Sequence, residues 1–252
     1  MYVPMNSSAN LNVSVGTPTI ASGATSGAAI NVSLGTGASA GDFQALNSAG
    51  GTLTQINSGV AVASGGTFYV RKSIPTFAMI PTGLTVPSTG SPIYKFSVTA
   101  DPAGAVEWSK LTFNIATSST GTSSLTNLYL TDDASGNNLL TTTTGAVAGA
   151  TGSQTFTVNL LTNGVASTSQ IAAGATKTYD LYGTVAGFTT GSTVTISLAS
   201  DNSAVANAAA GSVSGNTVWS DRSAISHSTS TTDWTNGYLL KNFTSNAVSY
   251  SK

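Results

Sequence analysis

Apolar and polar residues alternate in many short runs of this chain, and this period of two constrains the fold more than any other feature. The alternation is strict across residues 94–100, 111–115, 156–160 and 193–198. In a β-strand it places apolar side chains on one face and polar ones on the other, the pattern of a sheet packed on one side. Turn-forming residues separate the runs. The sequence therefore predicts an all-β fold, an immunoglobulin-like β-sandwich.

A second feature is an internal repeat. Residues 21–34 recur, with changes, as residues 186–198, and residues 64–70 recur as residues 214–219. Such a recurrence marks a structural module that is used twice. Too few strands precede the first copy for a whole module, so we expect residues 1–73 to form only the closing half of one. Half a sandwich cannot bury its own core, which favours completion by another chain.

The predicted organisation has three parts. Residues 1–73 form the partial β-sandwich module, and residues 74–217 form a complete immunoglobulin-like β-sandwich. Residues 218–252 form a tryptophan-rich extension that packs on this sandwich. The partial module offers four to six short strands, at 11–15, 30–34, 43–46, 53–56, 60–63 and 68–70.

The first of these strands is the candidate for assembly. Its apolar residues Leu11, Val13 and Val15 alternate with polar ones. An open sheet edge presents unpaired N–H and C=O groups that another chain can satisfy. We therefore expect this strand either to be offered to a neighbouring copy or to patch the chain's own sheet.

Composition excludes several classes of partner. Only 7% of the residues are charged, against about 25% in typical soluble proteins. The net charge is −1, without any run of like charges, so we expect no nucleic-acid partner. No apolar stretch approaches the roughly 20 residues that span a bilayer. The chain has no cysteines, which excludes disulfides and thiolate metal sites and is compatible with bacterial secretion.

One cluster contains the parts of a catalytic site: Asp221, Arg222, His227, Ser228 and Asp233. A Ser-His-Asp relay needs a histidine held by a carboxylate beside an activated hydroxyl. In a serine-rich chain such neighbours arise by chance, and no Gly-x-Ser-x-Gly elbow is present. The structural alternative pairs the arginine with one of the two aspartates. We therefore predict that the protein is not an enzyme.

A second cluster surrounds a glycine turn. Asp132, Asp133 and Asn137 offer the oxygen ligands that calcium prefers. Their spacing lacks the regular alternation of an EF-hand loop, and an aspartate-rich hairpin turn needs no metal. Calcium at this turn is thus the one candidate cofactor, and otherwise we expect none.

Three aromatic residues form a candidate ligand platform. Trp219, Trp234 and Tyr238 lie close together in the tail and would suit a bound glycan. Aromatic side chains in sandwiches are more often core or end-cap residues. The alternative is therefore that these three close one end of the sandwich.

Four segments of the chain resemble a known family of proteins. They are residues 94–101, 108–113, 171–179 and 218–239. They resemble the C-terminal regions of large secreted surface proteins with tandem immunoglobulin-like domains from bacteria of the candidate phyla radiation. The resemblance covers about two-thirds of the chain, and residues 1–73 resemble the closing half of a preceding module. It implies a cell-surface location and a structural or adhesive role, for example in a surface layer. It supplies no catalytic residues.

These observations favour an extracellular structural protein that forms a surface layer or filament with copies of itself. The alternative is an adhesin or carbohydrate-binding surface module. The first residues lack the charged and apolar regions of a signal peptide. A secreted protein of this sequence would have lost its leader or would be numbered from inside a longer precursor, and the half-module favours the second.

Overall fold

The structure is a computed structural model of the 252-residue chain. It describes residues 3–4, 6–7, 9–10, 12–32, 45–53, 66–118, 123–141, 146–147, 152–240, 243 and 247–252. The predicted strand at 60–63 and the assembly candidate Leu11 lie outside the described residues.

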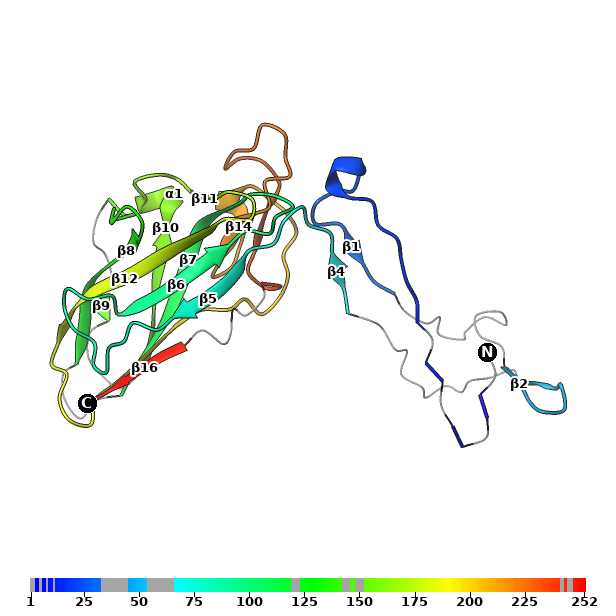
Figure 1. The fold of residues 1–252 in the computed structure, drawn as a ribbon, viewed down its shortest axis with the longest axis horizontal. Coiled ribbons are helices and arrows are strands. Elements are labelled where there is room, and N and C mark those ends of the chain that lie inside the picture. The colour runs from blue at the N-terminus through cyan, green and yellow to red at the C-terminus, as the bar shows by residue number, and fades with distance from the viewer. Residues whose placement is uncertain are drawn as a thin grey trace.

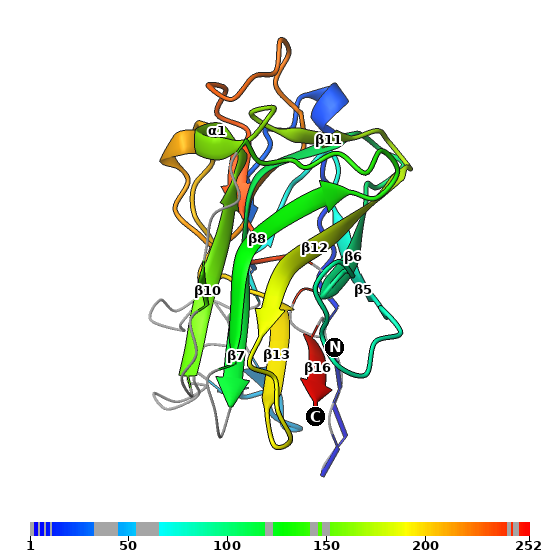
Figure 2. The ribbon, with the colours of Figure 1, turned by 90° about the vertical axis from the view of Figure 1, so that its left-hand side faces the viewer.

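Two antiparallel sheets pack face to face in the larger part of the molecule (Figures 1 and 2). Within the described residues, the first sheet has the order β5 (Thr76–Ile80), β6 (Tyr94–Thr99), β12 (Thr176–Ala186), β8 (Ser124–Asp132) and β9 (Ala146–Val147). The second has the order β15 (Trp234–Asn236), β14 (Val218–Ser220), β7 (Val106–Ser118), β13 (Thr193–Leu198) and β16 (Ala247–Ser251), with β10 (Gly152–Asn159) and β11 (Ser169–Ile171) also paired to β7.

This strand order matches the immunoglobulin arrangement. An immunoglobulin domain places strands A-B-E-D in one sheet and C-F-G in the other. Here β5-β6-β12-β8 and β7-β13-β16 occupy those positions, and β10 adds a strand on the other edge of β7. The predicted all-β, immunoglobulin-like sandwich is confirmed.

The C-terminal region is part of the sandwich rather than an extension packed on it. Strands β14, β15 and β16 all come from residues 218–252 and belong to the second sheet. β16 pairs with β13 in the position of the last immunoglobulin strand. The sandwich is therefore not complete at residue 217, because the outer edge of β13 needs a partner that only the tail supplies.

A short helix and two turns complete the sandwich and its flanks. Helix α1 (Leu160–Asn163) begins where the side chain of Asn159 accepts a hydrogen bond from the Leu161 N–H. The 3₁₀ turns are η1 (Ile20–Ser22) and η2 (Ala210–Ser212).

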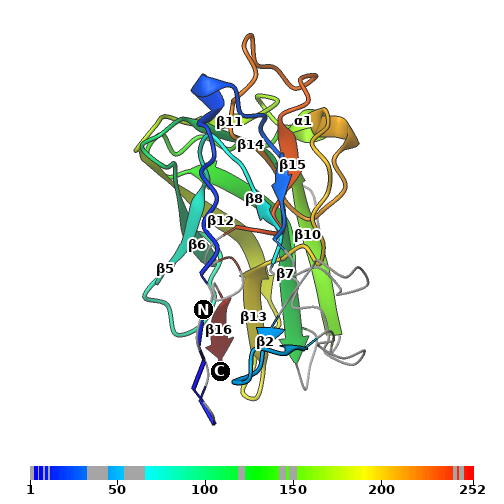
Figure 3. The same cartoon turned by 90° about the vertical axis from the view of Figure 1, so that its right-hand side faces the viewer.

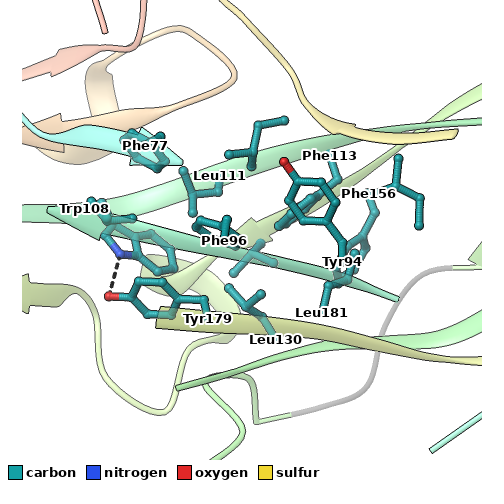
Figure 4. Packing of buried hydrophobic residues seen from close by; sticks show 14 of the residues in the cluster. Phe77, Tyr94, Phe96, Trp108, Leu111, Phe113, Leu130, Phe156, Tyr179 and Leu181 are labelled. Carbon is teal, nitrogen blue, oxygen red and sulfur yellow. Dashed lines mark hydrogen bonds between the residues drawn. The ribbon is translucent and has the colours of Figure 1, made fainter. Parts of the chain in front are cut away.

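Aromatic side chains fill the centre of the core (Figure 4). Trp108 on β7 lies edge-on to Tyr179, with ring centroids 5.5 Å apart, and its Nε1–H donates to the Tyr179 hydroxyl at 3.1 Å. Phe96 stacks on the same tyrosine at 5.3 Å. In antibody domains the tryptophan of strand C packs against a disulfide. This chain has no cysteines, and aromatic contacts hold the two sheets together instead.

The N-terminal region contains only short strands, and it lies to one side of the sandwich (Figures 1 and 3). β1 (Ala29–Ile30) pairs with β4 (Phe68–Tyr69), and β2 (Ala45–Leu46) pairs with β3 (Thr52–Leu53). The strand predicted at 11–15 is not formed over its described residues 12–15, which pair with no strand in the part of the chain that the structure describes. Up to residue 70, no residue whose exposure is described is buried. This region has no core of its own in the described residues.

We expect the substitution Tyr179→Phe to destabilise the sandwich. The hydroxyl is buried and bonds to both Trp108 and Ser169, and burial raises its pKa to about 12. Its removal leaves the indole N–H without an acceptor, at a cost of about 1–3 kcal/mol in the free energy of unfolding. Urea denaturation measures this cost. The control Tyr182→Phe, on the partly exposed face of the same strand, should change stability by about 0.5 kcal/mol or less. Equal losses in both variants would contradict the prediction.

Candidate functional site

A large groove lies in the N-terminal region among the described residues. It has a volume of about 1050 Å³ and runs between residues 13–21 on one side and β1 with β4 on the other. This volume lies above the roughly 300–1,000 Å³ of small-molecule pockets. Its apolar lining includes Val13, Val15, Ile30, Val32, Phe68 and Ile225.

The side chains that line this groove are exposed although they are apolar. Phe68 is 69% exposed, Val13 is 58% exposed and Val15 is 55% exposed. Contiguous exposed apolar surface of this kind marks an interaction site. Two of the three predicted assembly residues, Val13 and Val15, thus lie at the groove, and the third is outside the described residues.

Backbone pairing at the groove is also incomplete. Within the described residues β1 has a single ladder partner, β4. Each strand has two edges, so the other edge of β1 can accept a further strand. The groove therefore combines an open strand edge with an apolar lining, which are the two requirements for binding an extended peptide.

A buried carboxylate joins the N-terminal region to the sandwich. Asp221 directly follows β14 and is fully buried. Its Oδ2 accepts hydrogen bonds from the Ser26 hydroxyl at 2.7 Å and the Lys72 N–H at 2.9 Å. Both donors belong to the N-terminal region or its exit, so this one side chain fastens two of its segments to the second sheet.

Arg71 forms the other half of the junction. Its guanidinium donates to the Asn207 side chain at 2.7 Å and lies 5.7 Å from the ring centre of Trp219. Asn207 in turn donates to the Ser26 carbonyl at 3.1 Å. Burial lowers the pKa of Arg71, while the charge of Asp221 opposes that shift. Sequence reasoning missed Ser26, Arg71 and Asn207, because no local pattern distinguishes them.

The predicted catalytic cluster is only partly assembled. His227 Nδ1 lies 2.8 Å from Asp233 Oδ2, and His227 Nε2 lies 3.0 Å from Glu107 Oε2. In a Ser-His-Asp relay the second nitrogen faces the nucleophilic hydroxyl. Here a carboxylate occupies that place, and the Ser228 hydroxyl bonds to Ser230 at 2.8 Å.

The arginine partner differs from the one expected. Arg222 pairs with Glu107 on β7 instead of with Asp221 or Asp233. Asp221 is engaged in the junction, and Asp233 is engaged with the histidine. Glu107 is the only glutamate of the chain and sits within a buried run, which is the signal that sequence reasoning could have used. The arrangement ties the loop at 222–233 to the central strand.

Asp233 carries a pKa below its usual range. Burial alone would raise this pKa, but hydrogen bonds from the Thr231 hydroxyl, the Ala224 N–H and His227 outweigh it. The carboxylate therefore stays ionised at neutral pH and anchors the loop through several donors.

Two lysines form ion pairs with the aspartates of the candidate calcium turn. Lys95 Nζ lies 2.9 Å from Asp133 Oδ1 and lowers the pKa of that carboxyl, and Lys177 Nζ lies 3.4 Å from Asp132 Oδ2. The carbonyl of Asn137 accepts from the Asp132 N–H. Over the described residues, no group of three or more His, Asp or Glu side chains converges as a metal site. Calcium at this turn stays a prediction, and the ion would share these carboxylates with the two lysines.

The candidate platform residues do not share one exposed surface. Trp234 is fully buried and its Nε1–H donates to the Ser228 carbonyl at 2.8 Å. Trp219 is also buried and donates to the Asn236 carbonyl at 2.8 Å. Only Tyr238 is exposed. The burial of both indoles fits the alternative reading, in which these residues close one end of the sandwich.

Comparison of the chain with protein-family models and with curated proteins gives no match. No helix among the described residues is long and apolar enough to cross a bilayer.

We expect Asp233→Asn to remove part of the acid sensitivity of the protein. A carboxyl with a depressed folded-state pKa contributes stability that is present above its unfolded value of about 3.9 and is lost as pH falls through the lower folded value. The variant should be less stable at neutral pH and should lose less on acidification below about pH 4. Thermal unfolding across this range measures the difference. An unchanged slope in Asp233→Asn would contradict the prediction.

Proposed function

We propose that this protein is an extracellular structural subunit that assembles with copies of itself into a bacterial surface layer or filament. The observation that carries the proposal is the exposed apolar groove in a region without a buried core. Up to residue 70, every residue with a described exposure is at least partly open to solvent.

The physical argument begins with the cost of that exposure. Apolar surface gains about 25 cal/mol per Å² when it leaves water. The N-terminal region cannot bury its own apolar side chains, since its described strands are only two residues long. A second chain that enters the groove buries the apolar lining and can also pair with the edge of β1 that has no ladder among the described residues. Self-association would therefore both bury the exposed apolar side chains and pair the edge of β1.

The surface composition supports close packing between subunits. Charged residues make up 7% of the chain, and serine, threonine, asparagine and glycine replace them. Few charges must then be desolvated when two surfaces meet. The absence of cysteines and the resemblance to tandem-domain surface proteins support a location outside the bacterial cell.

The junction suits a structural role. Asp221 and Arg71 fasten the N-terminal region to the sandwich through buried or partly buried contacts. A subunit that transmits its position to neighbours needs such a defined connection, because a floppy one would leave the relative orientation of successive subunits unspecified.

One observation favours the alternative, a carbohydrate-binding module. Tyr129 and Tyr182 stack at 5.2 Å on the outward face of β8 and β12 and are partly exposed. Aromatic rings beside charged side chains, here Lys95, Asp133 and Asp180, can stack on a sugar while the charged groups bond to its hydroxyls. A glycan array in which binding is lost in Tyr182→Ala, but kept in Tyr238→Ala, would support this alternative over the first.

We expect the purified full chain to self-associate with rising concentration, with or without calcium. Phe68→Asp places a charge in the apolar groove and should weaken association at least tenfold, which corresponds to about 1.4 kcal/mol. Sedimentation velocity measures the shift, and negative-stain images distinguish sheets, filaments and single particles. The matched control Val165→Asp alters a side chain that is equally exposed but lies on the sandwich, and it should leave association unchanged.

Wild-type protein that remains monomeric at every concentration would contradict the proposed function. Equal effects of the two variants would show that association does not use the groove.

A further inference from the structure

The internal repeat shows what the groove lacks. Aligning the two copies places Ile30 and Val32 at the positions of Val194 and Ile196 on β13. In the sandwich both β13 side chains are completely buried. In the N-terminal region Ile30 is only partly buried and Val32 is 38% exposed. The same strand face is therefore covered in one copy and uncovered in the other.

The second echo gives the same result. Phe68 aligns with Val218, and Tyr69 aligns with Trp219. Val218 is 2% exposed in the sandwich, whereas Phe68 is one of the most exposed apolar residues described. Both stretches of the repeat therefore give the same result. The apolar side chain is buried in the sandwich copy and more exposed in the N-terminal copy.

In the sandwich, β16 is the strand on the outer edge of β13. Val248 lies opposite Ile196, and Tyr250 lies opposite Val194. Between them the Thr195 and Ser249 hydroxyls form a hydrogen bond of 2.8 Å. The strand that pairs with this edge therefore has the pattern apolar–serine–apolar in antiparallel register, while the core between the two sheets buries Val194 and Ile196.

The N-terminal segment 12–16 has that same pattern. Val13, Ser14 and Val15 repeat the order of Val248, Ser249 and Tyr250. The segment has no backbone ladder among the described residues, and its two valines line the groove. Among the described residues the segment has no ladder partner, and β1 beside it has β4 as its only ladder partner.

We propose that segment 12–16 of one copy enters the groove of a second copy and pairs with β1 as β16 pairs with β13. This inference rests on the proposed function and names the contact that would build the assembly. The equivalent register places Val13 opposite Val32, Val15 opposite Ile30, and Ser14 opposite Asn31.

The donor belongs to a second copy because the chain's own segment is already one wall of the groove. The groove between that wall and the strands β1 and β4 has a volume of about 1050 Å³. The turn between the segment and β1 is fastened to the sandwich where Ser26 bonds to Asp221. Each copy carries both the segment and the groove, so the same contact repeated head to tail from one copy to the next gives an open, heterologous row of subunits rather than a closed dimer.

Disulfide trapping tests this register, because the chain has no cysteine of its own. Full-length Ser14→Cys is mixed with full-length Asn31→Cys under mild oxidation. Residues directly opposite in an antiparallel pair have Cβ atoms about 4.5–5.5 Å apart, and a disulfide spans about 3.5–4.5 Å, so a small shift joins them. Both positions are exposed, so the substitutions leave the sandwich core intact.

We expect a mixed covalent dimer at least tenfold more abundant than in the matched control. That control mixes Ser14→Cys with Thr195→Cys, whose position is already paired with Ser249 of its own chain. The double variant Thr195→Cys/Ser249→Cys shows that the oxidation conditions work, since it should close within one chain.

Three results would overturn the inference. A Ser14→Cys/Asn31→Cys double variant that closes within one chain at high dilution would show that the segment patches its own sheet. Assembly by sedimentation without the mixed dimer would reject this strand and leave the proposed function standing. Absence of both assembly and mixed dimer would reject both.

Discussion

Backbone pairing along β7 is the constraint on which the rest of the structure depends. This thirteen-residue strand, Val106–Ser118, pairs with β10, β11, β13 and β14, each antiparallel. Its inward side chains include Trp108, whose indole N–H reaches across to the other sheet. Because so many strands share this one neighbour, the register of β7 sets the position of the second sheet as a whole. The aromatic contacts of the core then hold that sheet against the first without any covalent link.

The N-terminal region shows what the same repeat becomes without such a strand. β13 and β14 lie along one edge of β7 in the sandwich, whereas their counterparts in the N-terminal region, β1 and β4, pair with each other. Their ladder is two residues long and their apolar side chains stay open to water. Closely related stretches of sequence therefore adopt a buried or an exposed state according to the strands around them, which is a tertiary effect and not a local one.

The sequence was most informative where one strand face is buried. The run predicted at 193–198 is β13, and that at 94–100 is β6 to within a residue, because alternation directly reports one dry face. It was least informative where partners are distant. No sequence pattern near Asp221 indicates that its carboxylate accepts a hydrogen bond from the hydroxyl of Ser26, which is 195 residues away. Likewise no local signal pairs Arg222 with Glu107, and β16 was hidden in a tail whose tryptophans suggested an extension. Polar contacts between remote residues depend on the completed topology, which alternation does not encode.

The position of the junction has a mechanical consequence. Asp221 follows directly on β14, and β14 is hydrogen-bonded to β7 over Glu107 to Lys110. A pull on the N-terminal region reaches the sandwich by two routes. One is the backbone itself, which runs from Lys72 into β5 at the edge of the first sheet. The other is the hydrogen bond from the Lys72 amide to the buried Asp221 carboxylate, which passes load into β14 between β7 and β15. Load on an outer strand can peel it away one bond at a time, and the second route shares that load with a strand that has ladders on both of its edges.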